Sequence, residues 1–294
     1  MCLVSWIERN EIEGGNIPSA TMTMSNPSAD YPLGNTDTEH ERLIRQAGLV
    51  APTTERFFRE AGIGPGQRVL DIGSGVGDVA ILVAQLVGSS GEVVGVERDP
   101  KSIAKARARV NEAGLHNISF NESDVGKIRD EKPFDAAVGR FILMYLPDPV
   151  AALRSISRLV RQGGALVFQE PSWVPVLAHL GRLPLWFATV SLIDKTMRAF
   201  ANQEMGMELY RTFVEAGLPA PAMRMELSLG KEPDLAQWYY DLLCTLRPRI
   251  EQLHLSTKSL GALDTLVQRL QAEVAESKTV ACLFGSVGAW CRKV

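Results

Sequence analysis

Five short apolar runs alternate with helix-like stretches in the part of the chain between Gln67 and Pro171. The runs predict buried strands at 68–72, 92–97, 118–121, 134–138 and 165–169. Helical periodicity fills 78–87 and 101–113 between them. Strands joined by helices of this length lie parallel in one sheet, which the helices cover on both faces. The pattern therefore predicts an α/β fold with a doubly wound, mostly parallel sheet.

The rest of the chain divides into four further segments. Residues 1–30 are rich in Gly, Pro, Ser, Asn and Thr without periodicity, which predicts a flexible leader or a strap over a site. Residues 31–66 predict two N-terminal helices, the second of which follows Pro52. Residues 172–278 predict a helical substrate-binding insert that also supplies part of the sheet, and 279–294 predict a C-terminal strand.

Composition and charge exclude several classes of partner. The chain has 31 Lys and Arg against 34 Asp and Glu, a net charge of −3, without the basic excess that nucleic acid or an anionic membrane requires. It has no apolar run of about 18 residues, the length that spans a bilayer. The 4 cysteines form no CxxC pair, so we expect no metal, and the N-terminus does not resemble a signal peptide. These features favour a cytoplasmic location.

A glycine-rich turn, VLDIGSGVGDVA at 69–80, joins the first predicted strand to a helix. Gly73, Gly75 and Gly77 permit unusual backbone angles and let a ligand approach the main chain, beside the free N–H groups of the helix. A dinucleotide-binding turn requires its third glycine at position 78, where this chain has Asp78. A carboxylate there disfavours a pyrophosphate and suits a positively charged ligand without phosphate.

Two more acidic residues follow neighbouring strands. Glu97 ends the second strand, where a carboxylate accepts hydrogen bonds from a ribose diol, as it also does in nicotinamide-binding proteins. Asp124 follows the third strand, and its carboxylate could accept from the exocyclic amine of adenine while the N–H of Val125 completes the edge. The alternative for Asp124 is a helix N-cap. Together the two acids predict a nucleoside-binding site.

Taken in order, these motifs resemble the class I S-adenosylmethionine-dependent methyltransferase family, in particular members that modify small molecules. The resemblance covers roughly Gln67 to Pro171 and includes the segments FDAAVGRFILMYLPDPVAALR and RQGGALVFQEP. The segment YPLGNTDTEHERL at 31–43 also resembles a lead-in of small-molecule members. The resemblance implies a Rossmann-like sheet of seven strands, with 67–171 as the core that binds S-adenosylmethionine.

The resemblance also implies the cofactor contacts. The glycines would line the methionyl part, Asp71 or the carbonyl groups of 139–140 would meet the ammonium, and Glu97 would hold the ribose. Tyr31 would close over the methionyl end or simply pack at a domain edge. The implied cofactor-binding residues are Tyr31, Asp71, Gly73, Ser74, Gly75, Gly77, Glu97, Arg98, Asp124, Val125 and Arg140.

Methyl transfer from a sulfonium places few demands on catalytic groups, because the leaving group departs neutral. The protein must hold the acceptor in line and exclude water, and it needs a base only where the acceptor carries its proton. His179 and Tyr145 are the candidate catalytic residues, each with ordinary packing as the alternative. Glu170 could orient substrate or cap a turn, and His40 qualifies only if the lead-in helix lies over the site.

The acceptor is predicted from the aromatic residues and methionines after the fifth strand, which could line an apolar cavity or form the core of the added helices. They are Trp173, Trp186, Phe187, Met197, Phe200, Met205, Met207, Tyr210, Trp238, Tyr239 and Tyr240. The predicted reaction is in-line methyl transfer to an O, N or C atom of a small aromatic or lipophilic molecule. The alternatives are a nicotinamide-dependent oxidoreductase and a catalytically silent partner protein. An apolar stripe at 263–274 could serve a homodimer.

Overall fold

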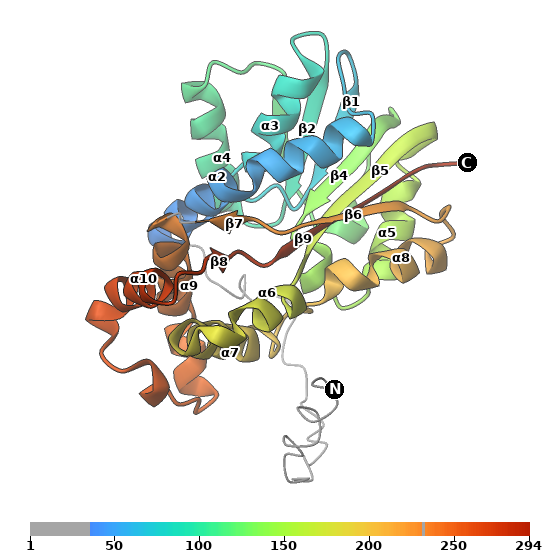
Figure 1. Cartoon of the computed structure of the whole chain (residues 1–294). Helices are drawn as coiled ribbons and strands as arrows, with labels where there is room; N and C mark the ends of the chain where they lie inside the picture. Colours follow the sequence, from blue (N-terminus) through green and yellow to red (C-terminus); the bar gives the residue numbers. More distant parts are fainter. Residues whose placement is uncertain (1–35, 231–232) are drawn as a thin grey trace. The chain divides into compact units, whose positions relative to one another are not determined.

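The computed structural model describes residues 36–230 and 233–294, which form the body drawn in colour in Figure 1. Tyr31 and the predicted leader at 1–30 lie outside the described residues. None of the described helices is long and apolar enough to cross a bilayer.

A seven-stranded sheet runs through the body in the order β3-β2-β1-β4-β5-β9-β6. Among the described strands of this seven-stranded sheet, only β9 runs antiparallel to its neighbours, β5 and β6. The mostly parallel Rossmann-like sheet expected from the sequence is confirmed. The strands are β1 (Arg68–Ile72), β2 (Glu92–Glu97), β3 (Ile118–Glu122), β4 (Phe134–Arg140), β5 (Val160–Ser172), β6 (Ala222–Glu226) and β9 (Gly285–Arg292).

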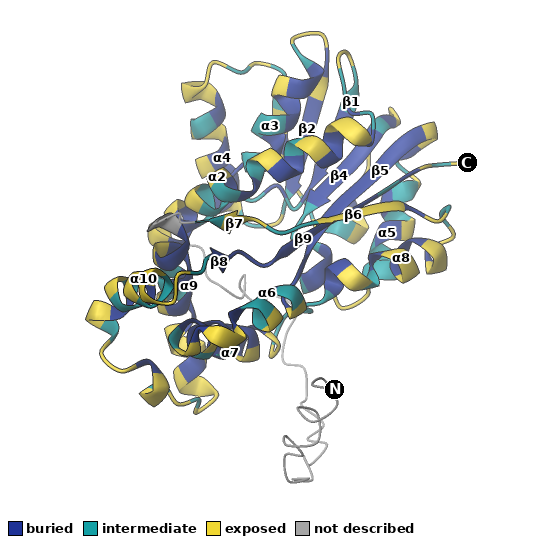
Figure 2. Cartoon of the chain, in the orientation of Figure 1, coloured by how far each residue is buried: buried dark blue, intermediate teal, exposed yellow. Residues whose placement is uncertain are grey.

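Helices cover both faces of this sheet (Figures 1 and 2). Successive residues of β1 point to opposite faces, so Val69 joins one buried apolar cluster and Leu70 the other. The cluster around Val69 includes residues of α2 (Asp37–Glu60), α3 (Asp78–Val87) and α4 (Pro100–Glu112). The cluster around Leu70 includes residues of α5 (Pro149–Ser157) and α8 (Met205–Glu215). Burial on both faces explains why the central strands are continuous apolar runs.

Two insertions build a helical cap beyond the sheet. The first, between β5 and α8, holds α6 (Val174–His179) and α7 (Pro184–Met197). The second, between β6 and β9, holds α9 (Pro233–Gln252) and α10 (Leu266–Glu276) with the paired short strands β7 (Leu229–Gly230) and β8 (Ala281–Cys282). The segment predicted as one insert at 172–278 is thus split, because α8 and β6 belong to the sheet layers. The short 3-10 helices are η1 (Val125–Lys127), η2 (Leu143–Tyr145), η3 (Leu180–Arg182), η4 (Lys258–Leu260) and η5 (Leu263–Thr265).

The N-terminal helix differs from its prediction. A single helix, α2, runs from Asp37 to Glu60 with Pro52 inside it, so the expected break into two helices is wrong. Val50 before the proline and Phe57 after it are both buried on one apolar face, while Pro52 is exposed. Packing of that continuous face against the sheet outweighs the local cost of a proline in a helix.

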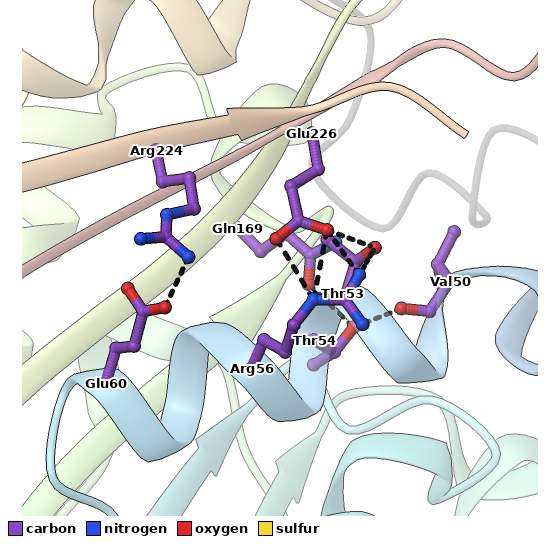
Figure 3. A network of polar contacts seen from close by, with 8 residues as sticks. All are labelled: Val50, Thr53, Thr54, Arg56, Glu60, Gln169, Arg224 and Glu226. Atoms are coloured by element: carbon purple, nitrogen blue, oxygen red, sulfur yellow. Dashed lines mark hydrogen bonds and ion pairs between the residues drawn. The ribbon is translucent and has the colours of Figure 1, made fainter. Parts of the chain in front are cut away.

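Ion pairs fasten α2 to the edge strand β6 (Figure 3). Arg56 pairs with Glu226, whose carboxylate also accepts a hydrogen bond of 3.2 Å from the Thr53 hydroxyl. One turn further along, Arg224 pairs with Glu60. These contacts hold the C-terminal half of α2 to the sheet and so set the position of its N-terminal half.

The apolar stripe that could have served a homodimer packs within the chain. Leu266 and Leu270 on α10 are fully buried, and Leu263, Val267 and Val274 pack against the same core. The stripe therefore gives no support to the expectation of a homodimer.

Candidate active site

A cavity of about 510 Å³ lies where the loops after β1, β2, β3 and β4 meet α2 and the helical cap. In an open α/β sheet, this carboxyl edge of the strands is where ligands bind. The sheet register places Asp71 of β1 beside Gly95 of β2 and Val138 of β4, so the loops that follow these strands emerge together. The cavity thus draws its lining from segments that lie far apart in the sequence.

The three glycines of the turn differ in what lies next to them. Gly73, Gly75 and Gly77 all have positive φ, of 66°, 51° and 86°. A Cβ on Gly73 would lie 2.7 Å from Ile142, and one on Gly77 would lie 3.1 Å from Ala106. A Cβ on Gly75 would meet no atom of the described chain within 4 Å. Gly73 and Gly75 line the cavity, whereas Gly77 does not and instead begins α3 and allows close packing on α4.

Glu97 is held at the rim of the cavity by backbone groups. Its Oε2 accepts from the N–H of Gly75 at 3.0 Å, and its Oε1 accepts from the N–H groups of Arg98 at 2.8 Å and Asp99 at 3.0 Å. A carboxylate has about four acceptor positions, so room remains for a ligand hydroxyl. Glu97 and Arg98, two of the residues implied to bind the cofactor, both line the cavity.

Asp124 and Val125 also line the cavity, at the loop after β3. Asp124 directly precedes η1, but its side chain does not accept a cap hydrogen bond from that helix. It pairs instead with Lys127, Nζ to Oδ2 2.9 Å, and this hydrogen bond lowers the pKa of the Asp124 carboxyl. The helix-cap alternative for the Asp124 side chain is therefore wrong.

Asp71 is placed differently from the other predicted contacts. It is 1% exposed and does not line the cavity, and its carboxylate has no well-formed hydrogen bond within the described residues, although the backbone N–H of Ala80 lies close enough to lower its pKa. Burial raises the pKa of Asp71 to about 7, against the opposing charge of Arg140. Arg140 does line the cavity and donates to the Thr54 hydroxyl at 3.2 Å. Ser74 lines the cavity too, with a buried hydroxyl that has no partner within the described residues.

His40 reaches the cavity because α2 lies over the site, which was the condition for its candidacy. Its Nε2 lies 3.3 Å from the Ser102 hydroxyl, which in turn donates to Oδ2 of Asp99 at 2.7 Å. The single hydroxyl proton of Ser102 is committed to Asp99, so His40 Nε2 carries a proton and donates. The acceptor nitrogen of the imidazole is then Nδ1. This His40–Ser102–Asp99 chain joins α2 to α4 and was missed from the sequence.

Glu170 positions the loop that carries Tyr145. The Glu170 carboxylate is fully buried and accepts from the backbone N–H groups of Ile142 at 3.0 Å, Leu143 at 2.8 Å and Met144 at 3.3 Å. Burial raises the pKa of Glu170 to about 8, although these hydrogen bonds oppose the shift. Tyr145, one residue beyond, lines the cavity, while Glu170 itself does not.

His179 lies away from the cavity lining. Its Nε2 is 2.7 Å from the carbonyl oxygen of Val280, so the imidazole donates and ties the end of α6 to the strand region before β8. This position supports packing, the alternative given for His179, and gives no support to a catalytic role.

The predicted aromatic residues divide between the cavity and the core. Trp173 and Trp238 line the cavity together with Phe141 and Phe284, which the sequence analysis missed. Trp173 and Phe284 stack with ring centroids 5.7 Å apart. Phe141 has a positive φ of 55°, an unusual backbone conformation for a bulky residue at the turn after β4. Trp186 and Tyr239 pack in the core, and Phe187 and Tyr210 are exposed. No cluster of metal-ligating side chains occurs within residues 36–230 and 233–294.

A family model described as a methyltransferase domain matches residues 63–217, more than half of the chain. The chain belongs to the class I S-adenosylmethionine-dependent methyltransferases. This methyltransferase is 37% identical over 107 residues to aklanonic acid methyltransferase DauC of Streptomyces sp., which covers 36% of this chain and 49% of DauC. It is 35% identical over 156 residues to the ubiquinone/menaquinone biosynthesis C-methyltransferase UbiE of Coxiella burnetii, covering 51% and 59% of the two chains. The chain thus spans about half the length of these curated relatives.

Solved structures confirm the fold of this methyltransferase. The YcgJ protein of Bacillus subtilis superposes with a TM-score of 0.51 at 15% identity, covering 81% of this chain and 97% of the other. A putative methyltransferase of Bacillus halodurans superposes with a TM-score of 0.52 at 16% identity and the same coverage. At these identities the likeness concerns the fold alone.

The residues of this methyltransferase fit the cofactor of its family, S-adenosylmethionine. The open space beside Gly75 admits a ligand against the backbone, and Ser74 of the same turn lines the cavity with a hydroxyl that has no partner within the described residues. Glu97 stands where a ribose would be held, and Asp78 occupies the position at which a dinucleotide-binding turn has glycine. The family assignment therefore disfavours the alternative of a nicotinamide-dependent oxidoreductase.

Proposed function

We propose that the chain transfers a methyl group from S-adenosylmethionine to a small aromatic or lipophilic molecule. The observation that carries this proposal is that one cavity of about 510 Å³ has two unlike walls. The glycine turn, Glu97 and Asp124 form a polar wall suited to the cofactor. Trp173, Trp238 and their aromatic neighbours form an apolar wall suited to a flat acceptor.

The chain's main contribution is positioning. When bound, S-adenosylmethionine supplies an activated methyl group on a sulfonium. Gly75, Glu97 and Asp124 offer polar contacts to the cofactor at one end of the cavity. At the other end, the stacked Trp173 and Phe284 orient the plane of an aromatic acceptor. Holding two reactants in line can supply several kcal/mol of the barrier. The cap helices α7 and α9 contribute Met197, Trp238 and Leu242 to the lining at this end.

His40 is the chain's candidate for removing a proton from the acceptor. It lines the cavity, and the contact with Ser102 fixes the tautomer that leaves Nδ1 as the acceptor nitrogen. Tyr145, one of the two residues predicted from the sequence, lines the same cavity. A base is needed only for acceptors that keep their proton at the working pH.

The relatives support a small-molecule acceptor. The two curated relatives described above are named for aklanonic acid and for ubiquinone and menaquinone biosynthesis. Both names refer to small molecules. The acceptor atom of this chain, whether O, N or C, is what the experiment has to identify.

Two measurements test the proposal in sequence. Calorimetry with S-adenosylmethionine, S-adenosylhomocysteine and NAD should show binding of the first two and none of the third. Incubation with S-adenosylmethionine labelled on the methyl group and a panel of phenols, amines and carbon acids should then give a labelled organic product. Binding of NAD alone would contradict the cofactor. Cofactor binding without transfer to any member of a broad panel would favour the catalytically silent partner protein.

A further inference from the structure

Two polar side chains on the apolar wall of the cavity have no hydrogen-bond partner in the part of the chain that the structure describes. Gln203 is 0% exposed, and neither its Oε1 nor its Nε2 has a hydrogen-bond partner within the described residues. Trp238 is 3% exposed, and its Nε1 likewise has none. Both side chains line the cavity. Buried polar groups are almost always paired in native proteins, so three orphaned atoms beside one cavity require an explanation.

Gln203 is held in place by its neighbours. Asn202 donates its backbone N–H to the carbonyl of Met144 at 2.8 Å. The carboxylate of Glu204 accepts from the Ser172 hydroxyl at 2.6 Å and from the N–H of Trp173 at 2.9 Å. These contacts fix the loop between α7 and α8 on both sides of Gln203. The loop is therefore well anchored at Gln203, and loop mobility does not explain why the Gln203 amide has no partner within the described residues.

Trp238 contrasts with another buried tryptophan of the cap. Trp186 donates its Nε1–H to the carbonyl of Leu270 at 2.8 Å and does not line the cavity. Trp238 lines the cavity, and its ring lies 5.6 Å from that of Phe284. The protein thus satisfies the indole N–H that faces its own core and leaves unsatisfied the one at the cavity.

The surroundings of these atoms define what can pair with them. The described lining residues from position 171 onward carry no charge, and they are Pro171, Trp173, Met197, Gln203, Trp238, Leu242 and Phe284. An indole N–H can only donate, so Trp238 requires an acceptor such as a carbonyl oxygen. A carboxamide both donates and accepts, so Gln203 requires a hydroxyl as well as an acceptor. The guanidinium of Arg140, which also lines the cavity, lies at the edge of this wall, 5.9 Å from the ring of Phe141.

We infer that Gln203 and Trp238 select the acceptor of the proposed methyl transfer, an aromatic or conjugated molecule that carries both a hydroxyl and a carbonyl group. The inference rests on the proposed function, because it assigns this wall of the cavity to the acceptor. In this assignment, the stacked Trp173 and Phe284 pack against the aromatic ring of the acceptor. Gln203 and Trp238 form hydrogen bonds with the oxygen atoms of the acceptor. A site built this way rejects the hydrocarbon analogue, which would leave the polar atoms unpaired.

Three matched probes test the inference by calorimetry with S-adenosylhomocysteine already bound. They are a hydroxyacetylnaphthalene, the acetylnaphthalene without the hydroxyl, and ethylnaphthalene without either oxygen. We expect affinity to fall along this series, by roughly 5- to 100-fold for each lost hydrogen-bonding group. Gln203→Met should remove the preference for the hydroxyl, and Trp238→Phe should remove the preference for the carbonyl while keeping an aromatic ring.

Trp186→Phe is the matched control, because its indole N–H already has a partner inside the protein. It should lower the melting temperature and leave the ranking of the probes unchanged. Trp238→Phe and Gln203→Met should keep or raise the melting temperature, since they remove orphaned atoms. If the chain binds S-adenosylhomocysteine but binds the three probes equally, or binds none of them, the inference is overturned while the cofactor assignment stands. Failure to bind S-adenosylhomocysteine would overturn the proposed function itself.

Discussion

Glu97 accepts a hydrogen bond of 3.0 Å from the backbone N–H of Gly75, which joins the end of β2 to the turn that follows β1. The carboxylate therefore has two tasks in one position. It fixes the backbone of the glycine turn, and it stands at the rim of the cavity where a ribose would be held. We expect this contact to keep the turn in place before the cofactor binds, which would lower the entropic cost of binding.

Replacing Glu97 with alanine should weaken binding of S-adenosylmethionine by roughly 1–3 kcal/mol, the usual loss when a charged hydrogen-bonding partner is removed. Calorimetry measures the change. Glu92→Ala is the matched control, since Glu92 begins the same strand but is exposed and pairs with Arg68 away from the cavity. Equal dissociation constants for the two variants would contradict the role of Glu97.

Replacing Asp71 with asparagine should stabilise the chain increasingly as the pH rises. Burial raises the folded-state pKa of Asp71 to about 7, above its usual value of 3.8. Between these values the folded state holds a proton that the unfolded state has lost, so the stability that Asp71 contributes is present at low pH and is lost as the pH rises through about 7.

Denaturant unfolding at a series of pH values measures this effect of Asp71. The difference in unfolding free energy between the asparagine variant and the wild type should grow by roughly 1.4 kcal/mol per pH unit in the steepest part of the window. It should level off above pH 7 to 8. Parallel curves for the two proteins would show that Asp71 is ionised at low pH and has a partner in solution.

Substitution of the two histidines should separate catalysis from packing. With an acceptor that keeps its proton, His40→Ala should lower kcat by roughly 100-fold or more and remove a limb of the pH–rate profile. His179→Ala removes the contact with the Val280 carbonyl, so it should cost about 1 kcal/mol of stability and leave the profile unchanged. The opposite pattern would restore His179 as the catalytic candidate and remove His40.

Replacing Pro52 with alanine should stabilise the chain by roughly 1–3 kcal/mol, because proline in a helix interior lacks an N–H and crowds the preceding turn. Pro52 is exposed, so the change removes little packing. Pro100→Ala is the control, since Pro100 is exposed at the first turn of α4, where proline is favourable. Denaturant unfolding of both variants measures the difference. Destabilisation by Pro52→Ala would indicate two helices, as the sequence alone suggested.

Much of the cofactor side of the site could be predicted from the sequence, because its residues lie next to strand ends that are recognisable by themselves. Gly73, Gly75, Glu97 and Asp124 each lie at or just after the end of a predicted strand, and the structure brings all of them to one cavity. Gly77 is the exception, since whether a turn glycine faces a ligand or a neighbouring helix depends on what packs against it. Here Ala106 of α4 lies against Gly77.

The acceptor side could not be predicted in the same way. The sequence favoured His179 and admitted His40 only if the lead-in helix lay over the site, and the path of α2 over the sheet decides that His40 is the one that lines the cavity. Gln203 carries no sequence signal at all. Its position in the cavity wall is fixed by the adjacent residues, which contact Met144 and Trp173. These two residues lie 59 and 30 positions before Gln203 in the chain.

The sequence by itself therefore determined the parallel sheet, its family and the acids that line the cavity at the strand ends, because these depend on local periodicity and on residues at strand ends. Only the tertiary structure decided the continuity of α2 and the composition of the acceptor wall. Both depend on packing between segments distant in the chain, where a buried face such as that of Val50 and Phe57 outweighs local preference. Whether a polar atom such as Nε1 of Trp238 has a hydrogen-bond partner within the described residues can be judged only when the positions of all neighbouring groups are known.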